Sequence, residues 1–381
     1  MTLVACGDLR VGRGTENVIF NIIKYKPDGI DISIISSDYT GGNPLILSND
    51  EVNKLTNNCK TMKFNVKSFN AKNSSKISMA FRELIYKPVI RTFKSIPEHL
   101  LIQMRETEVV YLFCNQYSIF FNGMNIPIIG SNHLTDLGMY DAEHKFFVGI
   151  YYKLLFKRYY KHINGIHVFP YRHHLLTTSK LKYTMNLANG IDTSLFYPDY
   201  ENNIKLKFLF VASLRNEKGL DILLPLIEKI NSPNVEFHIA GGGPLADEIK
   251  NNKKIVYHGI LSDSALSKLY RECDVFIYPT HFDTFSLVTL QALSSGLYVM
   301  CSDYLKGNFD WFDNKYLEYL PLNFDIWYNR VKQIIDNKSI LNHDKKEEYN
   351  YVKNNYDWSI ISKKFYDYMI EFYNESKGLT L

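Results

Sequence analysis

Residues 205–300 repeat one pattern three times: a short apolar strand, a turn that contains glycine or serine, and a helix. The three turns lie at 211–219, 240–244 and 279–288. Strands that alternate with helices form a parallel sheet, and the turns that follow the strands meet at one edge of it. Helix N-termini at that edge favour an anion through their exposed N–H groups and their dipole. The pattern therefore predicts an α/β domain that binds phosphate.

Charged side chains in these turns narrow the choice of ligand. Arg215 and Lys218 lie in the first turn, and Asp283 lies in the third. Fixed cations suit a diphosphate, and a carboxylate can accept hydrogen bonds from sugar hydroxyl groups. The turns therefore predict a ligand that carries both groups, a sugar with a diphosphate.

The composition is that of an ordinary globular protein, with 46% hydrophobic and 22% charged residues, and 381 residues suit two domains. Five cysteines without a C-x-x-C pair predict reduced, mostly buried thiols rather than a disulfide framework or a zinc site. Charged residues from Asp8 onward interrupt the first apolar run, and no run reaches the roughly 20 residues of a spanning helix. We therefore expect no signal peptide and a cytoplasmic location.

The net charge of +4 is unevenly distributed. Residues 54–105 are strongly basic, and Glu83 and Glu98 are the only acidic residues among them. This segment is either an ordinary solvated surface or a face for an anionic acceptor or an acidic lipid surface. The second interpretation predicts peripheral contact with the inner face of a membrane. Nucleic acid is not expected, because the basic residues are dispersed and form no known reader motif.

The apolar runs predict two sets of buried strands joined by helices. Strands are expected at 3–6, 30–35, 109–113, 126–130 and 165–169, and then at 206–212, 234–240, 254–258, 274–278 and 297–301. Helices are expected near 75–104, 145–161, 324–336 and 357–376. A polar break after Pro198 separates the two sets, so we place the domain boundary between residues 198 and 199.

Six short motifs follow one another in an order that resembles one family. They are Asn189-Gly190-Ile191-Asp192, Lys218-Gly219, Ala240-Gly241-Gly242-Gly243-Pro244, His258-Gly259, the run from Asp274 to Pro279, and Asp283-(x7)-Gln291. Their order and spacing resemble the GT-B-fold glycosyltransferases of family 4, strongly over 185–305 and more weakly before it. The resemblance implies an α/β protein with two Rossmann-like domains that face each other across a cleft. Residues 1–198 would form the acceptor-side domain, 199–355 the nucleotide-sugar-binding domain, and 356–381 a helix that crosses back.

The resemblance also implies roles for individual residues. Lys218 and Arg215 would stabilise the charge that develops on the diphosphate as the sugar leaves. Asp283 and His133 would orient the transferred sugar. The family has Glu where this chain has Asp283 and Gln291, and it usually has Arg where this chain has Ser213. The expected donor-binding residues are Gly14, Arg13, Ser213, Gly242, Ile260, Phe285, Ser286, Leu287 and Gln291.

Each of these residues also has a plain structural interpretation. Lys218 and Arg215 could be solvated residues at a helix start, Asp283 a helix N-cap, Gln291 an exposed helical residue and His133 an ordinary loop histidine. The Gly12–Gly14 turn could simply open a helix, with no ligand.

The implied activity is transfer of a hexose, with retention of anomeric configuration, from a nucleotide diphosphate sugar to a hydroxyl on a glycan or lipid-linked intermediate. UDP-glucose is the first donor to consider. No metal and no cofactor are expected, since the nucleotide sugar is a co-substrate. Two alternatives stay open: a GT-B protein that binds a nucleotide sugar without turnover, and a nucleotide-sugar epimerase. A dinucleotide oxidoreductase is disfavoured, because neither half contains G-x-G-x-x-G with a following acidic residue.

Overall fold

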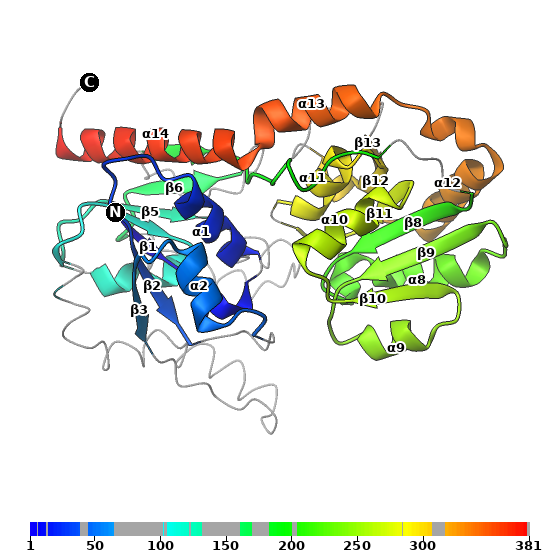
Figure 1. Cartoon of the computed structure of the whole chain (residues 1–381), viewed down its shortest axis with the longest axis horizontal. Coiled ribbons are helices and arrows are strands. Elements are labelled where there is room, and N and C mark those ends of the chain that lie inside the picture. Colours follow the sequence, from blue (N-terminus) through cyan, green and yellow to red (C-terminus); the bar gives the residue numbers. More distant parts are fainter. Residues whose placement is uncertain are drawn as a thin grey trace. The chain divides into compact units, whose positions relative to one another are not determined.

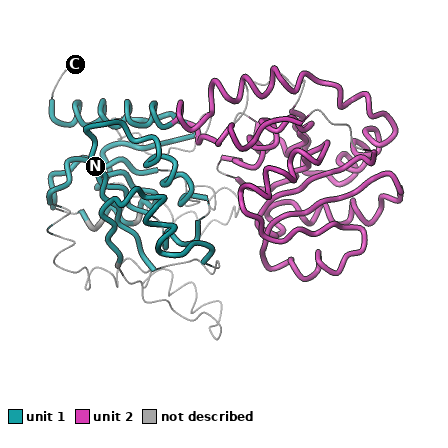
Figure 2. The backbone as a smooth tube through the Cα atoms, in the orientation of Figure 1, with its two compact units in different colours: residues 1–187, 362–381 teal, residues 188–361 magenta. Residues whose placement is uncertain are grey.

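The computed structural model describes residues 1–5, 7–12, 14–38, 45–64, 102, 105–121, 123–131, 161–169, 183–199, 204–283, 285–306 and 317–378. The chain forms two compact units, which Figure 2 shows in different colours. Unit 1 comprises residues 1–187 and 362–381, and unit 2 comprises residues 188–361. Each unit contains one parallel sheet with helices (Figure 1). The helices expected near 75–104 and 145–161 lie almost entirely outside the described residues.

The sheet of unit 1 has the strand order β3-β2-β1-β4-β5-β6-β7, with every neighbouring pair parallel. The order reverses between β1 and β4, as in a Rossmann-type sheet. The central strands are apolar and buried on both faces, which is why the sequence predicts them. The strands are β1 (Thr2–Val4), β2 (Ser33–Ser37), β3 (Lys60–Phe64), β4 (Val110–Leu112), β5 (Ile128–Ser131), β6 (Gly165–Val168) and β7 (Tyr183–Asn186).

Short helices connect the strands of unit 1. The apolar face of α1 (Thr15–Lys24) is buried, as its apolar spacing of three to four residues predicts. A capping box starts α2 (Asn49–Leu55), because Ser48 and Glu51 each accept a hydrogen bond from the other's backbone N–H. Two 3₁₀ helices, η1 (Leu9–Val11) and η3 (Asn115–Phe121), follow β1 and β4.

The sheet of unit 2 repeats this topology in the order β10-β9-β8-β11-β12-β13, again with parallel neighbours. The order reverses between β8 and β11 (Figure 1). The strands are β8 (Leu206–Val211), β9 (Val235–Ala240), β10 (Ile255–Gly259), β11 (Val275–Tyr278), β12 (Tyr298–Ser302) and β13 (Leu317–Leu320).

The helices of unit 2 alternate with its strands. The short helix α11 is buried on most of its surface and packs against α13. The helices are η5 (Asn216–Lys218), α8 (Leu220–Lys229), α9 (Ala246–Asn251), α10 (Asp263–Arg271), α11 (Leu287–Ser294), η6 (Asp303–Leu305), α12 (Phe324–Asp336), η7 (Lys338–Leu341) and α13 (Lys345–Tyr356). The chain then enters α14 (Trp358–Lys377), of which only residues 358–361 belong to unit 2.

The chain leaves unit 1 at Leu187, earlier than the boundary placed after Pro198. The intervening segment packs on unit 2. Ile191 pairs with Asp357 as a parallel bridge, and a Cβ on Gly190 would lie 2.7 Å from the Trp358 ring. Glycine at 190 therefore permits the backbone to approach the start of α14, and this contact assigns the segment to unit 2.

Most of α14 belongs to unit 1 (Figure 2). The Tyr366 hydroxyl donates to the carbonyl oxygen of Ile22 at 2.7 Å. The Phe365 ring meets Tyr111 edge to face, with 5.0 Å between the ring centroids. Residues 362–377 thus form part of the core of unit 1, although they follow unit 2 in the sequence.

Candidate functional site

The candidate site of unit 2 lies where the strand order of its sheet reverses. Ligands of open α/β sheets bind outside the carboxyl ends of the strands at such a switch point. The turn after β8 carries Lys218, and the turn after β11 carries Asp283. These strands are the two neighbours at the switch point, so the topology brings the first and third predicted turns together.

Lys218 and Asp283 form an ion pair across these turns. The Lys218 ammonium donates to the carbonyl oxygen of Phe282 at 2.9 Å and lies 3.3 Å from Oδ2 of Asp283. The two side chains are 20% and 18% exposed, so a ligand can reach both. Lys218 is therefore held in place rather than freely solvated, and Asp283 is not a helix cap, since Ser286 occupies the N-cap of α11.

Hydrogen bonds tie the third turn to the first. The backbone N–H of His281 donates to the carbonyl of Glu217 at 3.0 Å. The Thr280 hydroxyl lies 3.3 Å from that carbonyl and 2.9 Å from the carbonyl of Phe282. The His281 ring pairs with Asp221 on α8, with 2.9 Å between Nε2 and the carboxylate oxygens. These hydrogen bonds fix the position of the third turn relative to the first, and so the positions of Lys218 and Asp283 relative to each other.

Gly219 permits the close approach of the two turns. Its φ of 92° lies in the left-handed region, and a Cβ there would be 2.1 Å from the carbonyl oxygen of Pro279. No L-amino acid with a side chain can adopt this position without moving one of the turns. Lys218 directly precedes this glycine, so its ammonium is positioned by the same contact.

The glycine turn after β9 packs against the turn after β8. A Cβ on Gly241 would lie 1.8 Å from the carbonyl oxygen of Ala212, and one on Gly243 would lie 2.7 Å from the backbone of Leu214. The N–H of Leu214 also donates to the Gly242 carbonyl at 3.0 Å. Glycine is needed at 241 and 243 because backbone meets backbone at this edge.

Ile260 covers Gly242. A Cβ on Gly242 would lie 2.7 Å from Cδ1 of Ile260, whose side chain is 44% exposed. The strand β10 shifts register at His258, just before this residue. The Nε2 atom of His258 lies 3.0 Å from Nδ1 of His238. Burial is the largest cause that lowers the pKa of both histidine rings. The predicted donor-binding residues Gly242 and Ile260 are thus adjacent in space, at the same edge of the sheet as Lys218.

The N-terminus of α11 already uses some of its donors. Ser286 accepts a hydrogen bond from the N–H of Thr289 at 3.3 Å, and the N–H of Leu287 donates to the carbonyl of Phe285 at 3.0 Å. The Leu287 N–H expected to bind phosphate would have to exchange this bond. Gln291, on the same helix, is half-buried, and its Oε1 lies 3.4 Å from the Tyr270 hydroxyl.

The remaining predicted residues are less closely associated. Arg215 and Ser213 are exposed, and the Arg215 side chain makes no hydrogen bond or ion pair within the described part of the chain. Gly14 is the N-cap of α1 in unit 1, with open space where a side chain would be. Arg13 and His133 lie outside the described residues.

Two residues that support the ion pair, Tyr278 and Thr280, were not predicted from the sequence. The Tyr278 hydroxyl donates to Oδ2 of Asp283 at 2.7 Å, and Thr280 contacts the carbonyl that holds Lys218. Tyr278 belongs to an apolar strand, where an aromatic residue reads as core. A strand-end tyrosine five residues before an acidic residue was the only available signal.

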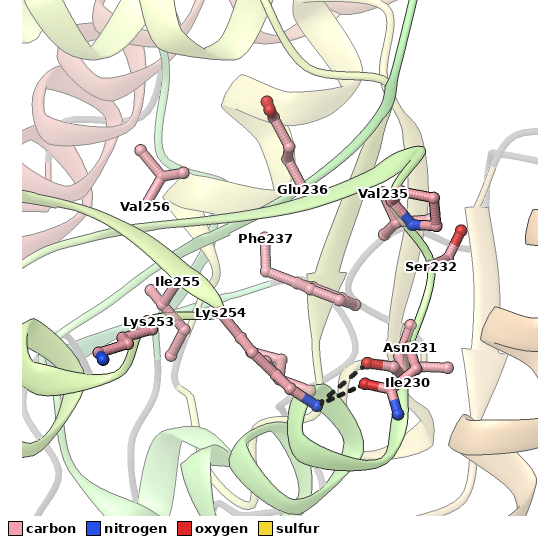
Figure 3. A pocket seen from close by; sticks show the side chains of 12 residues that line it. Ile230, Asn231, Ser232, Val235, Glu236, Phe237, Lys253, Lys254, Ile255 and Val256 are labelled. Carbon is pink, nitrogen blue, oxygen red and sulfur yellow. Dashed lines mark hydrogen bonds between the residues drawn. The ribbon is translucent and has the colours of Figure 1, made fainter.

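A pocket of about 570 Å³ lies at the opposite edge of the same sheet (Figure 3). It opens at the amino ends of β9 and β10, away from the switch point. The Lys254 ammonium is already bonded there to the Ile230 carbonyl at 3.3 Å and to Oδ1 of Asn231 at 3.1 Å. We therefore place the candidate site at the carboxyl edge. The pocket is lined by Ile227, Ile230, Asn231, Ser232, Pro233, Val235, Glu236, Phe237, Lys253, Lys254, Ile255 and Val256.

No group of three or more His, Cys, Asp or Glu side chains within the described ranges is arranged to hold a metal ion. None of the helices described above combines the length and apolar character needed to cross a membrane.

Known proteins resemble this chain both in sequence and in fold. Residues 205–320 match the family model of the group 1 glycosyl transferases. An uncharacterized glycosyltransferase of Methanocaldococcus jannaschii is 31% identical over 102 residues, which are 25% of this chain and 26% of that protein. The chain thus aligns with only about a quarter of the length of the curated relatives it matches first.

Solved structures match over nearly the whole chain. Sucrose-phosphate synthase from Thermosynechococcus elongatus has a TM-score of 0.72 at 13% identity, covering 98% of this chain and 99% of that one. Anabaena HepE in complex with UDP-glucose has a TM-score of 0.68 at 13% identity, covering 97% and 99%. The predicted α/β GT-B fold is confirmed, whereas membership of family 4 stays a prediction. This chain has the GT-B fold, and its residues 205–320 match the family model of the group 1 glycosyl transferases.

Proposed function

We propose that the protein transfers a hexose from a nucleotide diphosphate sugar to an acceptor hydroxyl, with retention at the anomeric carbon. The observation that carries the proposal is the Lys218–Asp283 pair, 3.3 Å apart at the switch point of unit 2. A cation for phosphate and a carboxylate for sugar hydroxyls stand side by side where such folds bind ligands. The match of residues 205–320 to group 1 glycosyl transferases supports the same assignment.

The chemistry requires charge stabilisation more than proton transfer by a side chain. As the bond from the sugar to the diphosphate breaks, negative charge grows on the phosphate oxygens. Lys218, together with the exposed Arg215, would stabilise that charge in the transition state. Asp283 would accept hydrogen bonds from the sugar, and Gln291 would contact the ribose. The acceptor proton would pass to the leaving diphosphate, so no separate carboxylate base is needed.

UDP-glucose is the first donor to test. The HepE structure, which shares this fold, was solved with UDP-glucose bound. The exposed Ile260 side chain beside Gly242 offers an apolar surface at the same edge for a base. The base would be recognised by main-chain groups near Ile260, which is compatible with more than one nucleotide.

We place a glycan or a lipid-linked intermediate as the acceptor, approached from the basic segment 54–105. Of this segment the structure describes residues 54–64, 102 and 105. Lys63 lies 3.1 Å from the buried Asp8 carboxylate, so part of its charge is neutralised within unit 1. The test is sedimentation with acidic liposomes after charge reversal at Lys87, Arg91 and Lys94. Unchanged liposome binding would refute the proposed membrane contact.

A thermal-shift screen of UDP-, GDP- and ADP-sugars tests the proposed function. A ligand that binds only the folded state raises the melting temperature. At a ligand concentration of 100 Kd it adds about 2.7 kcal/mol to the free energy of unfolding. Lys218→Ala should abolish the shift. Lys268→Ala is the matched control, since Lys268 is 73% exposed in the same unit and its ion pair, with Glu272, has a length of 3.7 Å.

Product analysis with the donors that bind, together with the screen, separates the alternatives. Binding without transfer or hydrolysis of any donor would favour a nucleotide-sugar-binding protein without turnover. A new nucleotide sugar formed in the absence of acceptor would identify an epimerase. A shift that survives in Lys218→Ala would place the ligand elsewhere and overturn the assignment of the site.

A further inference from the structure

Tyr278 is the last residue of β11 and lies under the candidate site. Its side chain is 1% exposed, and its hydroxyl donates a 2.7 Å hydrogen bond to Oδ2 of Asp283. A buried phenol needs an acceptor for its hydroxyl, and here that acceptor is the carboxylate proposed to hold the sugar. The tyrosine thus reaches from the core of the sheet to the ligand edge.

The same carboxylate oxygen has a hydrogen-bond donor and a separate ion-pair partner. Oδ2 of Asp283 is 2.7 Å from the Tyr278 hydroxyl and 3.3 Å from the Lys218 ammonium. The ammonium is also anchored at the Phe282 carbonyl, 2.9 Å away. The phenol sits on a rigid strand, whereas Lys218 has a long flexible side chain. The strand, rather than the lysine, therefore defines where the carboxylate stands.

The tyrosine remains a donor under all ordinary conditions. Burial is the largest cause that raises the pKa of Tyr278 well above its usual value, and the nearby Asp283 charge acts in the same direction. A protonated phenol against an ionised carboxylate makes a charge-assisted hydrogen bond, which is stronger than a neutral one.

We propose that Tyr278 is a positioning residue, which holds the Asp283 carboxylate where it contacts the donor sugar. Without the hydroxyl, the short aspartate side chain would no longer be held beside the sugar, whereas Lys218 would keep its anchor at the Phe282 carbonyl. The role is expected in this chain because Asp283 is one methylene shorter than glutamate and has less reach of its own. This inference rests on the proposed function, which it extends by one residue.

The test uses calorimetric titration of the full chain with UDP-glucose and with UDP, or with the corresponding pair for the donor that the screen selects. The ratio of the Kd of the nucleoside diphosphate to that of the nucleotide sugar measures the contribution of the sugar. In Tyr278→Phe this ratio should fall roughly tenfold, because a hydrogen bond to a charged group is lost. Affinity for the nucleoside diphosphate alone should change much less.

Two further variants make the result specific. In Asp283→Ala the ratio should already be low, and adding Tyr278→Phe should lower it no further, since the tyrosine then has nothing to position. Tyr366→Phe is the matched control, because this tyrosine is 2% exposed and its hydroxyl makes a bond of the same 2.7 Å length, to Ile22 in unit 1. Its ratio should equal that of the wild type.

The outcomes are distinguishable. A wild-type chain that binds neither ligand overturns the proposed function, and this inference with it. A wild type that binds both, with an unchanged ratio in Tyr278→Phe, overturns the positioning role alone. A ratio that falls equally in the presence and absence of Asp283 shows that the tyrosine acts through packing, which also overturns it.

Discussion

The close approach at Gly219 gives the sharpest test of how the site is built. Gly219→Ala adds a methyl group to a residue at φ 92°, where its Cβ would be 2.1 Å from the Pro279 carbonyl oxygen. Ordinary contacts of a Cβ are longer than 3 Å, so one of the two turns has to move by about 1 Å. Left-handed backbone costs an L-residue about 1–2 kcal/mol in addition.

The displacement should also break hydrogen bonds between the turns. The bond from the His281 N–H to the Glu217 carbonyl and the bond from Lys218 to the Phe282 carbonyl both cross the affected contact. Each is worth about 1 kcal/mol. With the backbone strain, we expect unit 2 to lose about 3–4 kcal/mol of unfolding free energy. Nucleotide-sugar affinity should fall as well, because a shift of about 1 Å at a site is functionally costly.

The chain provides a selective assay and a matched control. The described tryptophans, Trp327 and Trp358, both belong to unit 2, so tryptophan fluorescence during urea unfolding reports on that unit. Gly259→Ala introduces an alanine at φ 65° with open space around it, so it carries the backbone strain of about 1–2 kcal/mol without the clash. If Gly219→Ala is no less stable than Gly259→Ala, the argument from close approach is refuted.

Two buried titratable groups should give the units opposite pH dependence. Burial raises the pKa of Glu348 in unit 2 from 4.5 to about 7, so the folded unit binds its proton more tightly and should lose roughly 3 kcal/mol as pH rises through that window. Glu348→Gln should remove this slope in the tryptophan-monitored urea unfolding, and a slope that persists would contradict the assignment. Burial lowers the pKa of His167 in unit 1 from 6.5 to about 4, so stability present above pH 6.5 should fall by roughly 3 kcal/mol as pH drops to about 4. His167→Gln should flatten that pH dependence, because a neutral amide can replace both ring contacts, to Tyr111 and to the Leu187 carbonyl. The measurement is amide hydrogen exchange of the strands of unit 1, and equal slopes in the wild type and the variant would refute the role of His167.

Much of unit 2 could be predicted because its physics is local. Strands β8, β9, β11 and β12 are continuous apolar runs, and glycine or serine follows wherever the backbone has to turn. The confirmed fold follows from this alternation, since strands that are buried on both faces carry little other than apolar residues. The turn with Lys218 and the one with Asp283 were predicted to lie at one edge, and strand order alone brings them together.

Other elements could not be predicted, for identifiable reasons. The edge strand β3 contains Lys60 and Lys63, which give it no apolar run, and β7 is buried only at alternate residues. The helix α13 is mostly polar, so its spacing pattern is weak, although Val352 is fully buried. In each case the buried face is narrow, so few apolar residues mark the element in the sequence.

The ion pair between Lys218 and Asp283 shows why a site needs more than its residue list. The sequence assigns the cation to a phosphate and the carboxylate to a sugar, but without a ligand the two groups neutralise each other at 3.3 Å. Both are partly exposed, so their attraction is screened and worth at most about 1 kcal/mol. A diphosphate carries more charge than one carboxylate and is therefore the stronger partner for the ammonium. We expect its arrival to release Asp283, held by Tyr278 at the height of the sugar, so that the phosphate and sugar contacts form together.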